Sequence, residues 1–150
     1  MDMTSAIKVC FRKYFDFKGR AARPEFWWFQ LFIILVGIGL GFLLIQEITR
    51  DNVILDALTN LFFIIVFIPS FAVAARRLHD VNLSGYWQLP YILLTFAGYL
   101  PTHKLPSIVF LTYNVLMLCY IIAGICFLCK KGDENANQYG PPPTFEKDYA

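Results

Sequence analysis

The chain alternates four long apolar runs with shorter polar segments. The runs cover residues 26–45, 58–75, 85–100 and 107–129, and the first reads FWWFQLFIILVGIGLGFLLI. About 20 apolar residues in a helix cross the ~30 Å hydrocarbon core of a bilayer. Lipid offers no partner for free backbone groups, so such runs must be helical. We therefore predict an all-α membrane protein with four transmembrane helices.

The third run is the shortest, with Pro90 inside it and Pro101 directly after it. Either its helix begins earlier, at Asn82, or the bilayer is thinner around it. The pattern leaves both alternatives open.

In the first 19 residues, apolar residues recur with helical spacing, and basic residues fall on other faces of the same helix. We expect an amphipathic helix there, with Thr4 as the N-cap and Gly19 as the stop. Its aromatic face is flanked by basic side chains, which favours a helix lying on the membrane surface. The alternative is that this face packs against the end of the helix bundle. Residues 20–131 then form the transmembrane domain and residues 132–150 a polar tail.

The basic residues lie mostly on one side of the predicted spans. Of the 13 lysines and arginines, all but Arg50 and Lys104 fall before the first run, between the second and third, or after the fourth. Basic residues stay on the cytoplasmic side of inner-membrane proteins. We therefore expect both termini in the cytoplasm and an uncleaved first span. A net charge of only +2 argues against nucleic acid as a partner.

The cysteines suggest neither a disulfide framework nor a metal site. Three of the four, Cys119, Cys126 and Cys129, lie in the last apolar run. No histidine or second cysteine pair accompanies them to complete a zinc site. We expect no metal and no cofactor.

A charged segment, AARRLHDVNLSGYW, occupies residues 74–87, between the second and third runs. Arg76 and Asp80 are four residues apart, so they could pair on one helix. Asn82 fits a left-handed helix stop, and Ser84 fits the start of the next helix. Structural anchoring is the favoured interpretation of this segment, ahead of a binding or catalytic site.

Three motifs around the four runs are GRAARPEFWW, ARRLHDVNLSGYW and NQYGPPP. Together they resemble the family of small bacterial inner-membrane proteins called domain of unknown function 805 (DUF805), of the YhaH type. The resemblance covers nearly the whole chain, and the middle motif is the most specific. It implies the membrane architecture and carries no established activity.

The predicted topology places all three motifs on the cytoplasmic side, so we expect one polar cluster there. Arg20 or Arg23 would meet Asp80, Glu25 would meet Arg76 or Arg77, and a turn at Tyr139 would cover them. The candidate residues are Arg20, Arg23, Glu25, Trp27, Arg76, Arg77, His79, Asp80, Trp87, Asn137 and Tyr139. Surplus arginines in the cluster could also bind lipid phosphate.

Within the membrane, Asn114 is the best candidate for a hydrogen bond between helices, with Thr112, Thr59 or Asn60 as partner. The pair Gly37 and Gly41 forms a weak packing motif.

No catalytic constellation is evident, and the runs hold no acid, lysine or arginine for proton-coupled transport. We therefore expect a non-enzymatic structural or interaction module of the bacterial inner membrane, whose cluster contacts anionic lipid or a partner. The partner would be a second copy of the chain or another membrane protein. The alternative is a small transporter or channel component.

Overall fold

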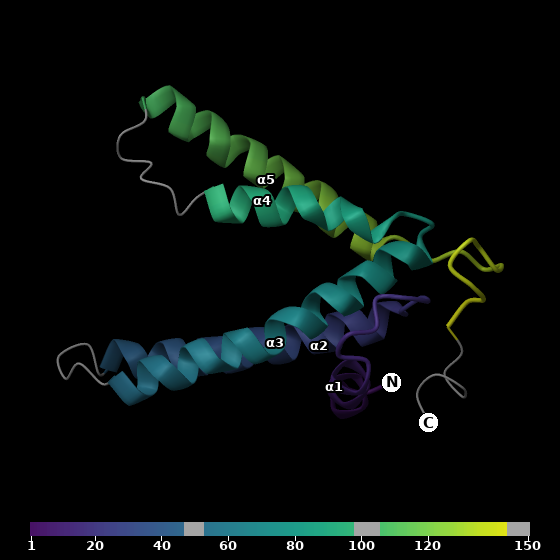
Figure 1. The fold of residues 1–150 in the computed structure, drawn as a ribbon, viewed down its shortest axis with the longest axis horizontal. Helices are drawn as coiled ribbons and strands as arrows, with labels where there is room; N and C mark the ends of the chain where they lie inside the picture. The colour runs from purple at the N-terminus through teal and green to yellow at the C-terminus, as the bar shows by residue number, and fades with distance from the viewer. Residues whose placement is uncertain (47–52, 98–105, 144–150) are drawn as a thin grey trace.

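The computed structural model describes residues 1–46, 53–97 and 106–143 (Figure 1). Apart from one isolated bridge between Asn137 and Gly140, the regular structure in these ranges is helical. The elements are α1 (Met3–Arg12), α2 (Arg23–Gln46), α3 (Val53–Asp80), the 3₁₀ helix η1 (Gly85–Gln88), α4 (Leu89–Ala97) and α5 (Ser107–Cys129).

Three of these helices, α2, α3 and α5, are long and apolar enough to cross a membrane. They correspond to the first, second and fourth predicted spans, and α5 has the predicted bounds. The third predicted span begins as η1 and continues as α4, which is described over 9 residues, or ~14 Å of helix. Its last positions lie outside the described residues. A fourth span therefore stays a prediction.

Helix α3 extends past the predicted run at both ends. It continues through Pro69 and ends at Asp80, so the charged middle motif forms its last turns. Asn82 follows with a φ of 59°, and its N–H donates to the carbonyl of His79. The Leu83 N–H reaches back to the carbonyl of Leu78, which completes a Schellman ending. The predicted helix stop at Asn82 is confirmed.

The helices form two pairs that share one end of the molecule (Figure 1). Helix α2 runs alongside α3, α4 runs alongside α5, and the two pairs diverge from the shared end. Helix α1 and residues 130–143 also lie at this end. The buried apolar core is there as well, and it consists of Cys10, Ala21, Phe26, Phe29 and Val73.

Helix α1 exists but differs from its predicted form. Its N-cap is Asp2, whose carboxylate accepts from the Ser5 N–H, and Thr4 already lies inside the helix. The helix ends at Arg12, and Gly19 takes its φ of 76° in a later turn. Both expectations were therefore wrong. Asp2, two residues before Thr4, already accepts a free N–H at the start of the helix, and the helix ends well before Gly19.

The inner side of α1 packs against the ends of α2 and α3. Ala6, Val9 and Cys10 are buried there, and the ring of Phe11 meets that of Phe29 edge to face, with 5.8 Å between centroids. This is the packing alternative that the sequence placed second. Placement of α1 on a membrane surface stays a prediction. Burial raises the pKa of the Cys10 thiol to about 12, so this thiol is neutral in the folded protein.

Candidate functional site

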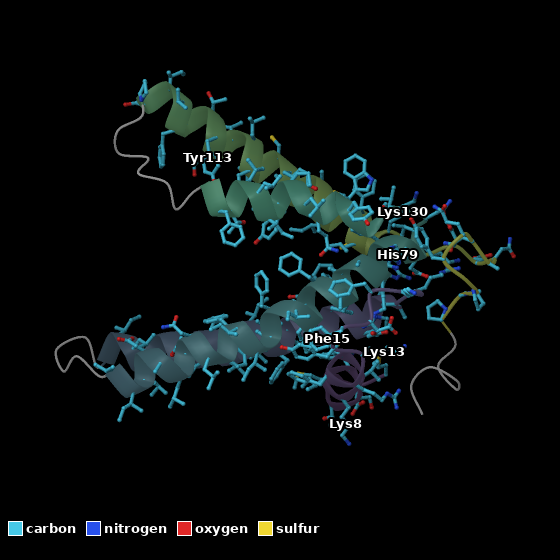
Figure 2. The ribbon with its side chains drawn as sticks, viewed as in Figure 1. Lys8, Lys13, Phe15, His79, Tyr113 and Lys130 are labelled. Atoms are coloured by element: carbon cyan, nitrogen blue, oxygen red, sulfur yellow. The ribbon has the colours of Figure 1, made fainter. Side chains whose placement is uncertain are left out.

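Side chains from three distant segments meet at the shared end of the helix pairs. Five of them form what we call the ion-pair cluster, and each is at least 93% buried: Arg20, Glu25, Arg76, Arg77 and Asp80. Figure 2 shows the surrounding region, with His79 of α3 and Lys130 beyond α5 labelled at this end of the molecule. Three arginines and two carboxylates leave the cluster with one net positive charge.

Asp80 is the centre of the ion-pair cluster. Its Oδ1 accepts from Arg20 Nε at 2.9 Å, and its Oδ2 pairs with Arg77 one turn earlier on α3. The backbone carbonyl of Asp80 accepts from the Asp133 N–H at 2.8 Å. One residue at the end of α3 therefore connects the segment before α2 to the segment after α5.

Arg20 holds the tail as well as Asp80. Its Nη1 donates to the carbonyls of Asn135, at 2.8 Å, and Gly140, at 3.3 Å, and its Nη2 donates to that of Asp133. All three guanidinium nitrogens thus have protein acceptors. Residues more than 110 positions apart in sequence are joined by one side chain.

Arg77 closes the end of α5. Its Nε donates to the carbonyl of Leu128 at 3.0 Å, and its Nη2 donates to that of Lys130. The last carbonyls of any helix lack partners within the helix. A guanidinium from α3 satisfies two of them and brings positive charge to the negative end of the helix dipole.

The second ion pair lies between α2 and α3. Arg76 Nη2 donates to Glu25 Oε1 at 2.8 Å, and the two side chains are 1% and 0% exposed. Within the described residues, Nε and Nη1 of Arg76 have no hydrogen-bond partner. Charges so well buried must be paired to be tolerated, and this pair leaves two donors unmet.

His79, in the last turn of α3, contacts the tail. Its ring stacks on that of Tyr139, with centroids 3.8 Å apart and planes 4° from parallel. Its Nδ1 lies 3.0 Å from the carbonyl of Gly19, and its own carbonyl accepts from the Asn137 side chain at 2.9 Å. The turn around Asn137 and Tyr139 is therefore attached to α3 by both of these side chains.

Three candidate residues are exposed. Arg23 is exposed, Trp27 is 38% exposed, and Trp87 in η1 is 57% exposed. Arg23 and Trp27 line an open groove of about 790 Å³ between the start of α2 and the tail. Trp28 and Lys131 complete the part of the lining that we call the rim: Arg23, Trp27, Trp28 and Lys131.

The groove also has acidic lining. Asp133 and Glu134 face it, and Glu134 forms an exposed ion pair with Lys131. Within the described part of the chain, the side chain of Arg23 forms no ion pair and no hydrogen bond. Of the four arginines considered for phosphate binding, Arg23 is the one that the fold leaves exposed.

Several sequence expectations need correction. Arg76 pairs with Glu25 and not with Asp80 of its own helix, because Asp80 points toward Arg20 and Arg77. Asn114 donates to the carbonyl of Phe110 in its own helix at 2.8 Å, and not to Thr112, Thr59 or Asn60. A Cβ on Gly37 would lie 3.5 Å from the Phe63 ring of α3, but a Cβ on Gly41 would meet nothing within 4 Å, so only Gly37 of the pair faces a described helix.

Reasoning from the sequence did not find the backbone carbonyls that accept hydrogen bonds from the arginines of the cluster. Gly132 lies so close to the Asp80 carboxylate that a Cβ there would clash with it. The carbonyls of Leu128, Lys130 and Asn135 accept from arginines. Carbonyls carry no sequence signature. The glycine directly after Lys131 was the one available sign of a close backbone approach.

The side-chain interactions described at this end are ion pairs, hydrogen bonds and ring stacking. In the ranges that the structure covers, no group of three histidine, cysteine, aspartate or glutamate side chains could hold a metal ion. His79, the titratable group suited to proton transfer, is occupied by the Gly19 carbonyl and the Tyr139 ring. These observations describe a helical membrane protein whose helix ends are joined by buried ion pairs.

The chain belongs to the family described as protein of unknown function DUF805, whose model matches residues 14–141. It is similar to two Escherichia coli K12 proteins named as inner membrane proteins. YhaI is 33% identical over 134 residues, which cover 89% of this chain and 91% of YhaI. YhaH is 33% identical over 139 residues, which cover 90% of this chain and 93% of YhaH. No solved structure matches the chain.

Proposed function

We propose that this protein is a non-enzymatic structural module of the bacterial inner membrane that binds anionic lipid headgroups at its cytoplasmic face. The ion-pair cluster is the structural part of the module, and the rim is the lipid-binding part. Both termini lie in the cytoplasm in this proposal, as the distribution of basic residues predicts.

One observation carries the proposal: the fold separates its arginines into two groups. Every guanidinium nitrogen of Arg20 and Arg77 donates to an acceptor in the chain itself. Arg76 is 1% exposed and paired with Glu25. Arg23, in contrast, lies exposed at the groove. A guanidinium matches a phosphate group in shape and charge, and Arg23 of the rim is the one of the four candidate arginines that can reach a phosphate.

The aromatic side chains of the rim support the same interpretation. Trp27 and Trp28 are each 38% exposed and lie in the first turns of a helix long enough to span a membrane. Tryptophan is enriched at headgroup depth, where its ring is partly apolar and its N–H can bond to water or phosphate. Arg23 beside these rings would therefore lie at the level of lipid phosphates.

Native mass spectrometry from mild detergent tests the lipid proposal. We expect the protein to retain phosphatidylglycerol in preference to phosphatidylcholine, and Arg23→Gln to reduce that preference by at least several-fold. Lys8→Gln is the matched control, because Lys8 is an exposed cation on α1, away from the groove. Equal retention of the two lipids would refute the proposal, as would equal effects of the two variants. Recovery of a stoichiometric protein partner that Arg23→Gln releases would replace lipid with protein as the ligand.

A further inference from the structure

Helix α5 presents one side to its neighbour α4. The hydroxyl of Tyr113 donates to the carbonyl of Leu94, and that of Tyr120 donates to the carbonyl of Trp87. Figure 2 shows Tyr113 in the region between the two helices. These two contacts fix the rotation of α5 about its own axis.

A second stripe on α5 lies about 130° away around the helix axis, at 3.6 residues per turn, and is exposed along its length. Its positions follow spacings of three and four residues, which place them on one narrow face. This face, which we call the α5 seam, consists of Leu111, Asn114, Leu118, Ile121 and Ile125. The apolar members are between 38% and 58% exposed. Such spacing is the pattern of a two-stranded coiled coil with one polar core position.

Asn114 is the feature that lipid alone does not explain. Its side chain is exposed on a helix of membrane-spanning length, and its Nδ2 donates to the Phe110 carbonyl at 2.8 Å. In the described ranges its Oδ1 accepts no hydrogen bond. Lipid tails offer neither donors nor acceptors, so an amide in hydrocarbon gains by meeting another polar group.

We propose that α5 packs along the α5 seam against α5 of a second copy of this chain, with the two Asn114 amides hydrogen-bonded to each other. Copies of one chain insert with the same orientation, so their α5 helices run parallel about a two-fold axis along the membrane normal. In a parallel pair, each position meets its own counterpart. An amide is both donor and acceptor, so Asn114 is complementary to itself.

The polar complementarity also fixes the register of the pair. A single asparagine in an otherwise apolar seam aligns two helices, because any shift leaves both amides facing hydrocarbon. The seam shares no residue with the rim or with the ion-pair cluster. Dimerisation and lipid binding can therefore fail independently of each other.

Disulfide crosslinking in native membranes tests the seam. In a background without the four native cysteines, we expect Leu118→Cys and Ile125→Cys to form dimers under mild oxidation. Leu116→Cys and Ala123→Cys are matched controls, because these residues are exposed at similar depths on the opposite face of α5. Faster crosslinking at the controls, equal crosslinking on both faces, or no dimer at the seam would each overturn the proposal.

Asn114 variants test the hydrogen bond. Hydrogen bonds between membrane helices change association by about three- to thirty-fold, and Asn114→Leu should weaken dimerisation by that factor. Asn114→Gln should retain most of it. Thr112→Val is the matched control. Like Asn114, Thr112 is a polar residue of α5 that donates to a carbonyl of its own helix, that of Ile108, but it lies off the α5 seam.

The readout is energy transfer between labelled copies in lipid vesicles. Unchanged dimerisation of Asn114→Leu would refute the role of the amide, and so would an equal loss in Thr112→Val. Arg23→Gln should leave dimerisation unchanged, which separates this proposal from the proposed lipid binding.

Discussion

The pair formed by Glu25 and Arg76 gives the sharpest test of the ion-pair cluster. The two side chains are 0% and 1% exposed and meet at 2.8 Å, so water does not weaken the interaction. Removing one member leaves the other charge buried without its partner. Such a loss costs about 3–5 kcal/mol. We expect Glu25→Gln and Arg76→Met each to destabilise the protein by that amount.

The double variant should behave quite differently from the sum of the two. Replacing both members of a buried pair is often neutral or stabilising, because no charge remains to be desolvated. Arg76 also has two nitrogens without a hydrogen-bond partner in the described ranges, and Arg76→Met removes them. We therefore expect the double variant to approach wild-type stability, with a coupling energy of at least about 3 kcal/mol.

Equilibrium unfolding in mixed dodecyl maltoside and dodecyl sulfate micelles measures these free energies. The pair between Lys131 and Glu134 is the matched control, because its side chains are 70% and 74% exposed and should give additive effects. If the double variant is as unstable as the sum of the two single variants, within about 0.5 kcal/mol, direct pairing of Glu25 and Arg76 is refuted.

Three further predictions follow from close contacts and burial. Gly132→Ala should destabilise the protein by about 1–3 kcal/mol in the same assay, because its Cβ would clash with the fixed Asp80 carboxylate. Gly41→Ala is the control and should not destabilise the protein, because a Cβ there would meet nothing within 4 Å. Gly85→Ala should loosen η1 from α3, because its Cβ would lie 2.9 Å from the Cβ of Ala75 in α3. Proteolysis near η1 should then be faster, and an unchanged rate of cleavage would contradict this prediction. With its thiol pKa at about 12, Cys10 should be about 10⁻⁴ thiolate at pH 8 and resist iodoacetamide until the protein unfolds, as peptide mass spectrometry can show.

The membrane helices were predictable because hydrocarbon imposes a length and an apolar composition that a sequence displays directly. α5 has the bounds that its apolar run indicates, and the Asn82 stop follows from the backbone conformation that asparagine tolerates. The third predicted span was harder to judge. Its run is short and proline-containing, and the described part of it is a 3₁₀ turn followed by 9 helical residues.

The partners within the ion-pair cluster were only partly predictable. Helical spacing allowed Arg76 to reach Asp80, but the rotation of α3 directs Arg76 to Glu25 and leaves Asp80 to Arg20. That rotation depends on packing between helices, which one sequence does not reveal. The docking of α1 depended on the same information. Its stripe of Ala6, Val9 and Cys10 suits a helix partner as well as a membrane surface.

The bonds from Arg20 to the carbonyls of Asn135 and Gly140 have a consequence for biosynthesis. Arg20 is made before α2, and its carbonyl acceptors are made only after the whole of α5. In a truncated product that stops after α5, Arg20 would keep its pair with Asp80 but its Nη1 would lack both carbonyl acceptors. Such a fragment would present a charged, loosely closed surface that quality-control proteases could distinguish from the complete protein.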